Sequence, residues 1–408
     1  MKNAIVGQSG GPTAAINATL SGVISACYQS GEIDTLYGAL YGIDGVLKEQ
    51  FCSLFEKVKD EHDHKLLQST PASALGSCRK KLPKPEKDGE GAEIYTKIFE
   101  TLDKYDIKYF FYIGGNDSMD TVHKLSVWAK LIDSDIRFIG VPKTIDNDLS
   151  LTDHTPGFGS AVKYLSLSVA EMIRDTEVYD LPAVTIIEVM GRDAGWLTAG
   201  AALSRIVNGT SADFVYLPET PFSCEKFARD VKERLKTKNN VVVLVSEGVR
   251  DENGVYVGES SQSGKVDAFG HKYLAGTGKA LEEYVKETIG CKVRSVEINI
   301  LQRCASHVAS KTDIDESVAI GSHAVKLALS GKTGMMATFE RRSTNPYVCT
   351  VGEADLGKIA NEVRVVPSKF INEEKNNVTD ECLEWILPLI QGETEIEYEG
   401  GLPVHFKI

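Results

Sequence analysis

Apolar and polar residues follow two alternating patterns along the chain. Short runs rich in Val, Ile, Phe and Tyr predict buried strands, and longer stretches with apolar residues three to four positions apart predict helices. The strand candidates are residues 3–7, 107–115, 136–142, 183–191, 240–248 and 292–301. The helix candidates between them are residues 13–29, 92–104, 118–131, 158–174 and 225–236.

This alternation of strands and helices predicts an α/β fold with largely parallel sheets and flanking helices. The strands are apolar along almost their whole length, which fits burial on both faces of a sheet. Because 408 residues exceed one ordinary core, two domains are expected. The charged, Gly- and Pro-rich stretch 78–93 predicts a surface loop, and the tail after about residue 340 has a mixed pattern that predicts no particular element.

Composition narrows the class of protein. With 42% hydrophobic and 25% charged residues the chain is typical of soluble globular proteins, and no apolar run approaches the ~20 residues that span a bilayer. The N-terminus lacks a secretory pattern, and eight scattered cysteines without a CxxC motif favour reduced thiols in the cytoplasm. A net charge of −13 disfavours nucleic acid as a partner. Basic groups for an anionic substrate would therefore have to gather in the site.

Glycine-rich segments follow the first two of these strands. Ligands bind beyond the carboxyl ends of strands in open α/β sheets, so these segments are candidates for binding. Gly10 and Gly11, before a helix expected to begin near Thr13, let backbone amides approach a phosphate. The segment GGNDS at 114–118 repeats this arrangement, with Ser118 a candidate helix cap. An ordinary capped turn explains each segment equally well when it is taken alone.

The segment VPKTIDND at 141–148 follows the third strand. Its two aspartates, Asp146 and Asp148, suit phosphoryl transfer, because one carboxylate can take a proton from an attacking hydroxyl and the other can hold Mg²⁺. Lys143 beside them can neutralise phosphate oxygens. The alternative is a polar turn with exposed side chains.

Further charged residues stand near later strands. Arg192 follows Gly191 at a point where a helix should start, and an arginine beside a helix N-terminus is a suitable anion site. Glu247 follows the fifth strand and can accept hydrogen bonds from a sugar hydroxyl. Arg294 and Arg303 flank the last strand and together can bind a phosphate. Each of these residues can also be an ordinary surface charge, but their recurrence at strand ends predicts phosphoryl transfer to an anionic sugar.

The segments GGNDS, PKTIDND, EVMGRDAGW, SEG and LQR, in this order and spacing, resemble the phosphofructokinase family, as does the early SGGPTAAINA. The resemblance covers about the first 330 residues and implies two Rossmann-like domains with the active site between them. Residues 1–155 plus about 304–360 would bind the phosphoryl donor and Mg²⁺. Residues from about 156 to 303, plus part of the C-terminal tail, would bind the sugar phosphate. A homodimer or homotetramer is also implied.

The same resemblance assigns individual roles. Asp146 matches the general base for the 1-hydroxyl of fructose 6-phosphate, and Thr144 and Arg192 match groups that contact the transferred phosphoryl. Other positions match donor-binding, sugar-binding and metal-binding residues of the family. The donor set is Gly11, Arg79, Asn116, Asp117 and Lys143; the sugar set is Thr144, Asp146, Met190, Gly191, Arg192, Glu247, Arg294 and Arg303; the metal set is Asn116 and Asp148.

Two departures from the family pattern indicate the donor. Asp117 and Lys143 stand where ATP-using members have glycine. Asp117 would repel the α-phosphate of ATP, and Lys143 would neutralise a small donor, so both predict pyrophosphate. An ATP-dependent phosphofructokinase and a non-catalytic sugar-phosphate sensor on the same fold are the alternatives.

Other departures affect the acceptor and regulation. Asn116 stands where many relatives have a metal-binding aspartate, and Ala183 and Ile300 replace an arginine and a histidine near the sugar phosphate of relatives. The acceptor could also include sedoheptulose 7-phosphate, because one extra carbon needs only space in the pocket. Ser21 and Ser25 replace effector-binding arginines of regulated bacterial relatives, which predicts no nucleotide allostery of that kind.

Overall fold

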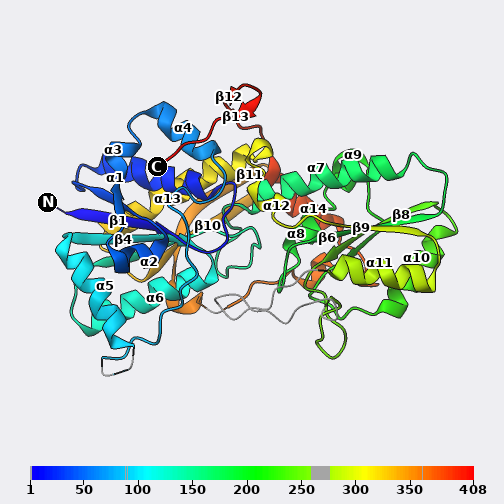
Figure 1. Ribbon diagram of the computed structural model, residues 1–408, viewed down its shortest axis with the longest axis horizontal. Coiled ribbons are helices and arrows are strands. Elements are labelled where there is room, and N and C mark those ends of the chain that lie inside the picture. Colours follow the sequence, from blue (N-terminus) through cyan, green and yellow to red (C-terminus); the bar gives the residue numbers. More distant parts are fainter. Residues whose placement is uncertain (1, 88, 90, 259–275, 361) are drawn as a thin grey trace.

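Two sheets organise the chain in the computed structural model, which describes residues 2–87, 89, 91–258, 276–360 and 362–408. They form the cores of two lobes that lie side by side (Figure 1). The larger sheet has the strand order β11-β10-β5-β4-β1-β2-β3, and the smaller has the order β7-β8-β6-β9. The smaller sheet is parallel throughout, and the larger is parallel from β2 to β10 with an antiparallel strand at each edge.

The strands of the larger sheet are β1 (Asn3–Gln8), β2 (Leu36–Ala39), β3 (Phe51–Ser53), β4 (Ile107–Gly114), β5 (Arg137–Pro142), β10 (Met335–Thr344) and β11 (Tyr347–Asp355). The strands of the smaller sheet are β6 (Ala183–Val189), β7 (Phe214–Tyr216), β8 (Asn240–Ser246) and β9 (Lys292–Glu297). A short separate ribbon consists of β12 (Tyr398–Glu399) and β13 (Leu402–Pro403).

Helices cover both faces of each sheet. The larger-sheet lobe contains α1 (Ile16–Ser30), α2 (Gly42–Lys48), α3 (Leu54–Lys57), α4 (Glu61–Ser69), α5 (Ala92–Lys104), α6 (Asn116–Leu131) and α13 (Lys311–Leu329). The other lobe contains α7 (Phe158–Thr176), α8 (Trp196–Gly200), α9 (Ser204–Asn208), α10 (Cys224–Leu235), α11 (Thr277–Thr288), α12 (Leu301–Cys304) and α14 (Asp380–Ile386).

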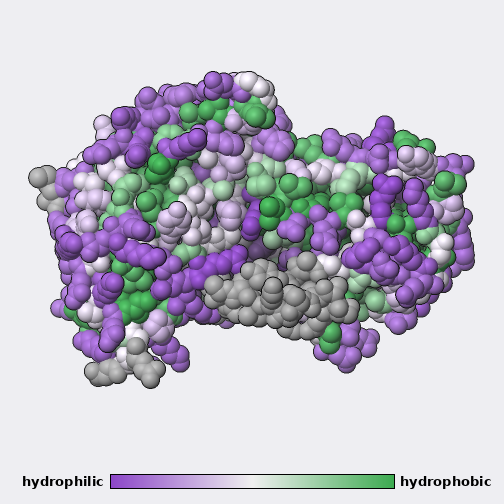
Figure 2. Space-filling model, viewed as in Figure 1, coloured by the Kyte–Doolittle hydropathy of each residue, from purple (hydrophilic) through white to green (hydrophobic). Residues whose placement is uncertain are grey.

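Apolar side chains fill the layers between sheets and helices. In the larger-sheet lobe, one buried cluster joins the sheet to α1 and α13, and another joins it to α5 and α6. In the smaller-sheet lobe, one cluster involves α7, α8 and α14, and another involves α10 and α11. Hydrophilic residues cover most of the face seen in Figure 2, with hydrophobic residues in separate patches. Among the described residues, no helix has both the length and the apolar character that a membrane span requires.

The α/β prediction is confirmed, and the six predicted strands and five predicted helices all form. Their ends differ where local geometry overrides the apolar pattern. The last predicted strand stops at Glu297, because Asn299 adopts a left-handed φ of 48° and α12 begins at Leu301. The first helix begins at Ile16 rather than near Thr13.

Ser118 does not cap its helix as predicted. Helix α6 starts at Asn116 with Gly115 as its N-cap residue and no side-chain cap bond, so Ser118 lies inside the first turn. A side chain at Gly114 would collide with Ser118, which explains why this glycine precedes the helix.

The unassigned tail contributes to both lobes. It begins with the antiparallel pair β10–β11 at the edge of the larger sheet, then crosses to α14 in the other lobe and returns to end beside α4. The chain also crosses between the lobes after β5 and before α13. We propose that the two lobes are the two domains expected from the sequence.

Candidate active site

A cavity of about 390 Å³ lies where the carboxyl ends of both sheets face each other. Twelve of the predicted site residues line it. These are Gly11, Arg79, Asn116, Asp117, Lys143, Thr144, Asp146, Asp148, Met190, Arg192, Glu247 and Arg303. The parallel sheets bring them together, because each follows or neighbours a strand whose carboxyl end points to the cavity.

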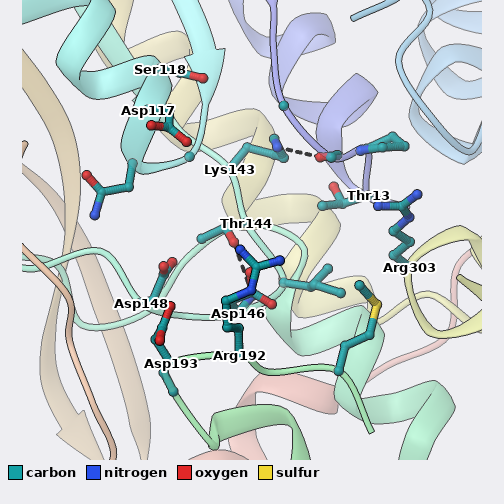
Figure 3. Close-up of a pocket in the computed structure, with 18 of the residues that line it drawn as sticks. Thr13, Asp117, Ser118, Lys143, Thr144, Asp146, Asp148, Arg192, Asp193 and Arg303 are labelled. Carbon is teal, nitrogen blue, oxygen red and sulfur yellow. Dashed lines mark hydrogen bonds between the residues drawn. The ribbon is translucent and has the colours of Figure 1, made fainter. Parts of the chain in front are cut away.

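Lys143 occupies the side of the cavity formed by the larger sheet (Figure 3). Its side chain is buried, and its Nζ donates to the carbonyl oxygen of Gly11, 2.5 Å away. Burial lowers the pKa of the amine to about 8, although the carboxylates of Asp146 and Asp148 favour the charged form. The lysine is thus a fixed cation between the glycine turn and the two aspartates.

Two arginines reach the same glycine turn. A Cβ atom at Gly11 would lie 3.1 Å from Nη1 of Arg303, so glycine allows the guanidinium to approach the backbone. Burial lowers the pKa of Arg303, and the charge of Arg79 lowers it further. Gly10 has a φ of 79°, which favours glycine at this turn. The turn therefore gathers positive charge that suits a compact, highly charged anion.

The turn at residues 144–148 presents the two aspartates. The hydroxyl of Thr144 accepts a hydrogen bond from the backbone N–H of Asp146 at 3.1 Å, and Asn147 between the aspartates has a left-handed φ of 53°. Burial raises the pKa of Asp146, while the charges of Lys143 and Arg192 oppose this rise. A carboxylate with a raised pKa that is flanked by cations can accept a proton near neutral pH.

The smaller sheet builds the opposite side of the cavity around Gly191. Its φ of 140° and the 2.6 Å that would separate a Cβ from the carbonyl oxygen of Ala194 require glycine. The N–H of Gly191 donates to Oε1 of Glu247 at 3.2 Å, and the hydroxyl of Ser246 donates to the carbonyl oxygen of Gly191. Burial raises the pKa of Glu247 to about 8. Glu247 can therefore exchange hydrogen bonds with a sugar hydroxyl.

Oxygen atoms on one side of the cavity suit a divalent cation. Burial, together with the charges of Asp146 and Asp193, raises the pKa of Asp148 to about 7. A cation would relieve this repulsion, and carboxylate and amide oxygens are ligands that Mg²⁺ accepts. Among the described residues, the two tight groups of metal-binding side chains both lie outside this cavity. The protein would thus supply only part of a coordination shell, which fits an ion completed by substrate phosphate oxygens.

Arg294 is not part of this cavity. It pairs with Thr185 near the beginning of β6, far along the strand from the carboxyl end where the cavity lies. It lines a small separate hollow with Ala183 and Tyr179, and its side chain is 47% exposed. The expectation that Arg294 and Arg303 share one phosphate site is therefore wrong within a single chain.

Lys81, Asp193 and Val363 are among the residues that line the cavity and that the sequence reasoning did not assign to the site. Nζ of Lys81, in the predicted surface loop, lies 3.8 Å from Oδ1 of Asp117. Asp193 lies near Asp148 in Figure 3. Val363 comes from the tail that had no predicted element. Asp193 could have been noticed as the acid directly after Arg192, but Val363 carries no chemical signal in the sequence.

Comparisons with known proteins place the chain in a family. A sequence model described as phosphofructokinase matches residues 3–328. The chain is 40% identical over 407 residues to a pyrophosphate–fructose 6-phosphate 1-phosphotransferase of Halomonas elongata, covering 98% of this chain and 94% of the relative. It is 37% identical to the protein of the same name from Methylococcus capsulatus, with coverages of 98% and 94%. The crystal structure of a pyrophosphate-dependent phosphofructokinase from Nitrosospira multiformis matches with a TM-score of 0.88 at 37% identity, covering 98% of this chain and 95% of that one.

Proposed function

This chain belongs to the phosphofructokinase family, and on that premise we propose that it transfers a phosphoryl group from pyrophosphate to the 1-hydroxyl of fructose 6-phosphate. The products are fructose 1,6-bisphosphate and orthophosphate. Both donor and product are phosphate compounds of comparable transfer energy, so the reaction runs in both directions. The observation that carries this proposal is the buried cation Lys143 beside the glycine turn, with Asp117 close by.

The proposed chemistry follows from the charges around Asp146. Its carboxylate accepts the proton of the 1-hydroxyl, and the sugar oxygen attacks the terminal phosphorus of pyrophosphate as the bond to the leaving orthophosphate breaks. Thr144 and Arg192 contact the transferred phosphoryl group in this proposal, and Lys143 neutralises the leaving phosphate. The charges of Arg192 and Lys143 both act on Asp146 and favour its ionised form, which supports their sharing of the developing charge.

Donor choice rests on Asp117 and Lys143 acting together. Asp117 stands in the first turn of α6, and its carboxylate would meet the α-phosphate of a nucleotide with like charge. Pyrophosphate has no such group, and its charge is concentrated on few atoms that Lys143, Arg79 and Arg303 can neutralise. The same arrangement therefore favours the small donor and disfavours the large one.

We further propose that the divalent metal is Mg²⁺, held by Asp148 with Asn116 nearby. When bound, the ion would neutralise phosphate oxygens of the donor. A cytoplasmic homodimer or homotetramer without nucleotide allostery belongs to the same proposal. The hydroxyl of Ser21 supports the last point, because it is engaged by His64 and Gln68 and offers no positive charge.

A coupled assay tests the function directly. Purified protein is given fructose 6-phosphate or sedoheptulose 7-phosphate with either pyrophosphate or ATP, and Mg²⁺ is present. Turnover with pyrophosphate at least about 100-fold faster than with ATP is expected, since two like charges placed together at one subsite cost several kcal/mol. Equal rates with the two donors would refute the assignment of Asp117, and binding without turnover would show a sensor.

A double variant tests whether Asp117 and Lys143 select the phosphoryl donor. Asp117→Gly with Lys143→Gly should lower turnover with pyrophosphate and raise turnover with ATP. The control is Asp120→Gly with Lys124→Gly, which likewise replaces one aspartate and one lysine by glycine, here an ion pair of α6 outside the cavity. This control reports the loss of helix stability, about 1 kcal/mol per glycine, and should leave the donor ratio unchanged.

A further inference from the structure

A five-residue segment of the C-terminal tail, residues 362–366, joins the two lobes beside the cavity. We call it the strap. It runs between the short helical turns η3 (Leu356–Lys358) and η4 (Ser368–Phe370), and Figure 1 shows this part of the chain crossing from one lobe to the other. Val363 within it lines the cavity on the side of Asn116 and Asp148.

The strap holds the turn that carries the catalytic aspartates. The backbone N–H of Arg364 donates to the carbonyl oxygen of Asp148 at 2.7 Å. Its Nη1 donates to Oδ1 of Asn147 at 3.3 Å. Because Asn147 lies between Asp146 and Asp148 in a left-handed conformation, these two bonds fix how both carboxylates point.

The strap also holds the beginning of α6. The side-chain amide of Asn116 donates through Nδ2 to the carbonyl oxygen of Glu362 at 2.7 Å. An aspartate at this position has no hydrogen to donate and would face the carbonyl with its own negative charge. The amide is therefore the side chain that this contact requires, which gives a physical reason for asparagine at position 116.

The other edge of the strap is bound to the smaller-sheet lobe. The indole Nε1 of Trp196 donates to the carbonyl oxygen of Arg364 at 3.0 Å, and the N–H of Val366 donates to Oε1 of Glu219 at 2.8 Å. The guanidinium of Arg364 lies over the rings of Trp196 and Trp385, at 4.5 and 5.4 Å from their centres. The planar cation is stacked rather than solvated, and lysine could not reproduce this geometry.

From these contacts we propose that the strap is a positioning element of the active site and that Arg364 is its central positioning residue. The strap connects the Asn147–Asp148 turn and Asn116, which lie on the metal side of the cavity, to the lobe that carries the sugar-binding residues. Arg364 acts through Asn147 and Asp148 and does not touch substrate. This inference rests on the proposed function, since it assigns the strap to that reaction.

The proposal is tested with Arg364→Met, Arg364→Lys and the control Arg205→Met. Arg205 also binds the tail, through Asp380 and the carbonyl oxygen of Val378, but lies outside the cavity. For each protein, kcat, both KM values and the Mg²⁺ concentration for half-maximal rate are measured with pyrophosphate. The rise in melting temperature caused by Mn²⁺ alone is measured without substrates, as a readout of metal binding that is independent of turnover.

In Arg364→Met, the Mg²⁺ concentration for half-maximal rate should rise about 10-fold, and kcat should fall about 10-fold. Partners of metal-binding residues commonly contribute this much. The KM for fructose 6-phosphate should change less than about two-fold, and the stabilisation by Mn²⁺ should be lost. Arg364→Lys should recover the charge but not the stacked geometry, and so remain below wild type. Arg205→Met should melt earlier than wild type yet keep the wild-type metal requirement.

Two results would overturn the inference. One is a metal requirement in Arg364→Met equal to that of Arg205→Met, which would make the strap a purely structural link. The other is an Asn116→Asp variant with the wild-type Mg²⁺ requirement, kcat and melting temperature, since the Glu362 contact would then have no effect. If wild-type protein turns over but these variants do not differ from it, the strap proposal alone fails. If wild-type protein has no activity with pyrophosphate, the proposed function fails first.

Discussion

On the larger-sheet side of the cavity, Lys143 and Arg303, which reaches across from α12 of the other lobe, meet at the Gly11 turn, whereas on the smaller-sheet side Glu247 and Arg192 meet at Gly191. The first arrangement concentrates positive charge around a backbone turn. The second combines one cation with a carboxyl group whose pKa is raised by burial. The difference matches two kinds of ligand: a compact anion with many charges needs cations, and a sugar needs groups that exchange hydrogen bonds with hydroxyls.

The comparison also explains why Asp146 stands where it does. It lies between the two sides, close enough to Lys143 and to Arg192 for both charges to lower its pKa against the effect of burial. A proton acceptor in this position can serve a hydroxyl held by one side and a phosphoryl group held by the other. Variants on each side should therefore affect one substrate, and a variant at Asp146 should affect the reaction itself.

The largest effect is expected from Asp146→Asn, which removes the proton acceptor and keeps the side-chain shape. Turnover should fall by at least about 100-fold, while both KM values change less than about three-fold. Steady-state kinetics with each substrate varied in turn measures this. Near-normal turnover would show that another group accepts the proton. Asp146 would then not be the group that acts on both the sugar hydroxyl and the phosphoryl group.

Lys143→Met should weaken the use of pyrophosphate and leave fructose 6-phosphate binding almost unchanged. Loss of a buried charge that faces pyrophosphate is worth about 2–3 kcal/mol, so kcat/KM for pyrophosphate should fall by about 30–150-fold. The KM for fructose 6-phosphate should stay within about two-fold of wild type. Lys81→Met is the graded comparison, because Lys81 lines the same side but is 51% exposed and should lose only a few-fold. Equal losses in the two variants would mean that burial of Lys143 has no special role.

Glu247→Gln should weaken the binding of fructose 6-phosphate and leave pyrophosphate binding almost unchanged. The amide keeps an acceptor for the N–H of Gly191 but alters the hydrogen bonds offered to the sugar, so the KM for fructose 6-phosphate should rise about 10-fold. The matched control is Glu188→Gln, a buried acid of β6 outside the cavity whose pKa is also raised, to about 7. A change in the KM for pyrophosphate equal to that for the sugar would contradict the division of the cavity.

The sequence predicted the elements and the motif residues well where the information is local. Strands such as 240–248 are apolar throughout, and the residues after them converge because parallel strands share a carboxyl edge. The predictions failed where distant segments decide the outcome. Strand β10 pairs with β5 only at Met335 and Met336. Its second half, with Glu340, Arg341 and Arg342, has only the edge strand β11 as a neighbour, so its pattern is not that of a buried strand.

The same limit applies to individual site residues. Val363 reaches the cavity, and Arg364 reaches Asn147 and Asp148, only because the tail crosses between the lobes, and nothing in their local sequence indicates chemistry. Arg294 and Arg303 lie apart within a single chain for a related reason. Proximity to one strand does not place both of its ends at the same site, and only Arg303 lies at the carboxyl end.

The smallest expected effect is a pH dependence that belongs to the donor side. Burial lowers the pKa of Lys143 to about 8, so in the free protein the amine is charged below that pH and loses its proton as the pH rises through it. Because pyrophosphate binding uses the charged form, kcat/KM for pyrophosphate should fall a few-fold between about pH 7.5 and 9. Lys143→Arg keeps its charge over this range, so its profile should be flatter, whatever its absolute activity. Titration of the substrates is common to both proteins and cancels in the ratio of their profiles. A ratio that stays constant over this range would assign the pH dependence to a group other than Lys143, and would remove the buried cation as the basis for the difference between the two sides.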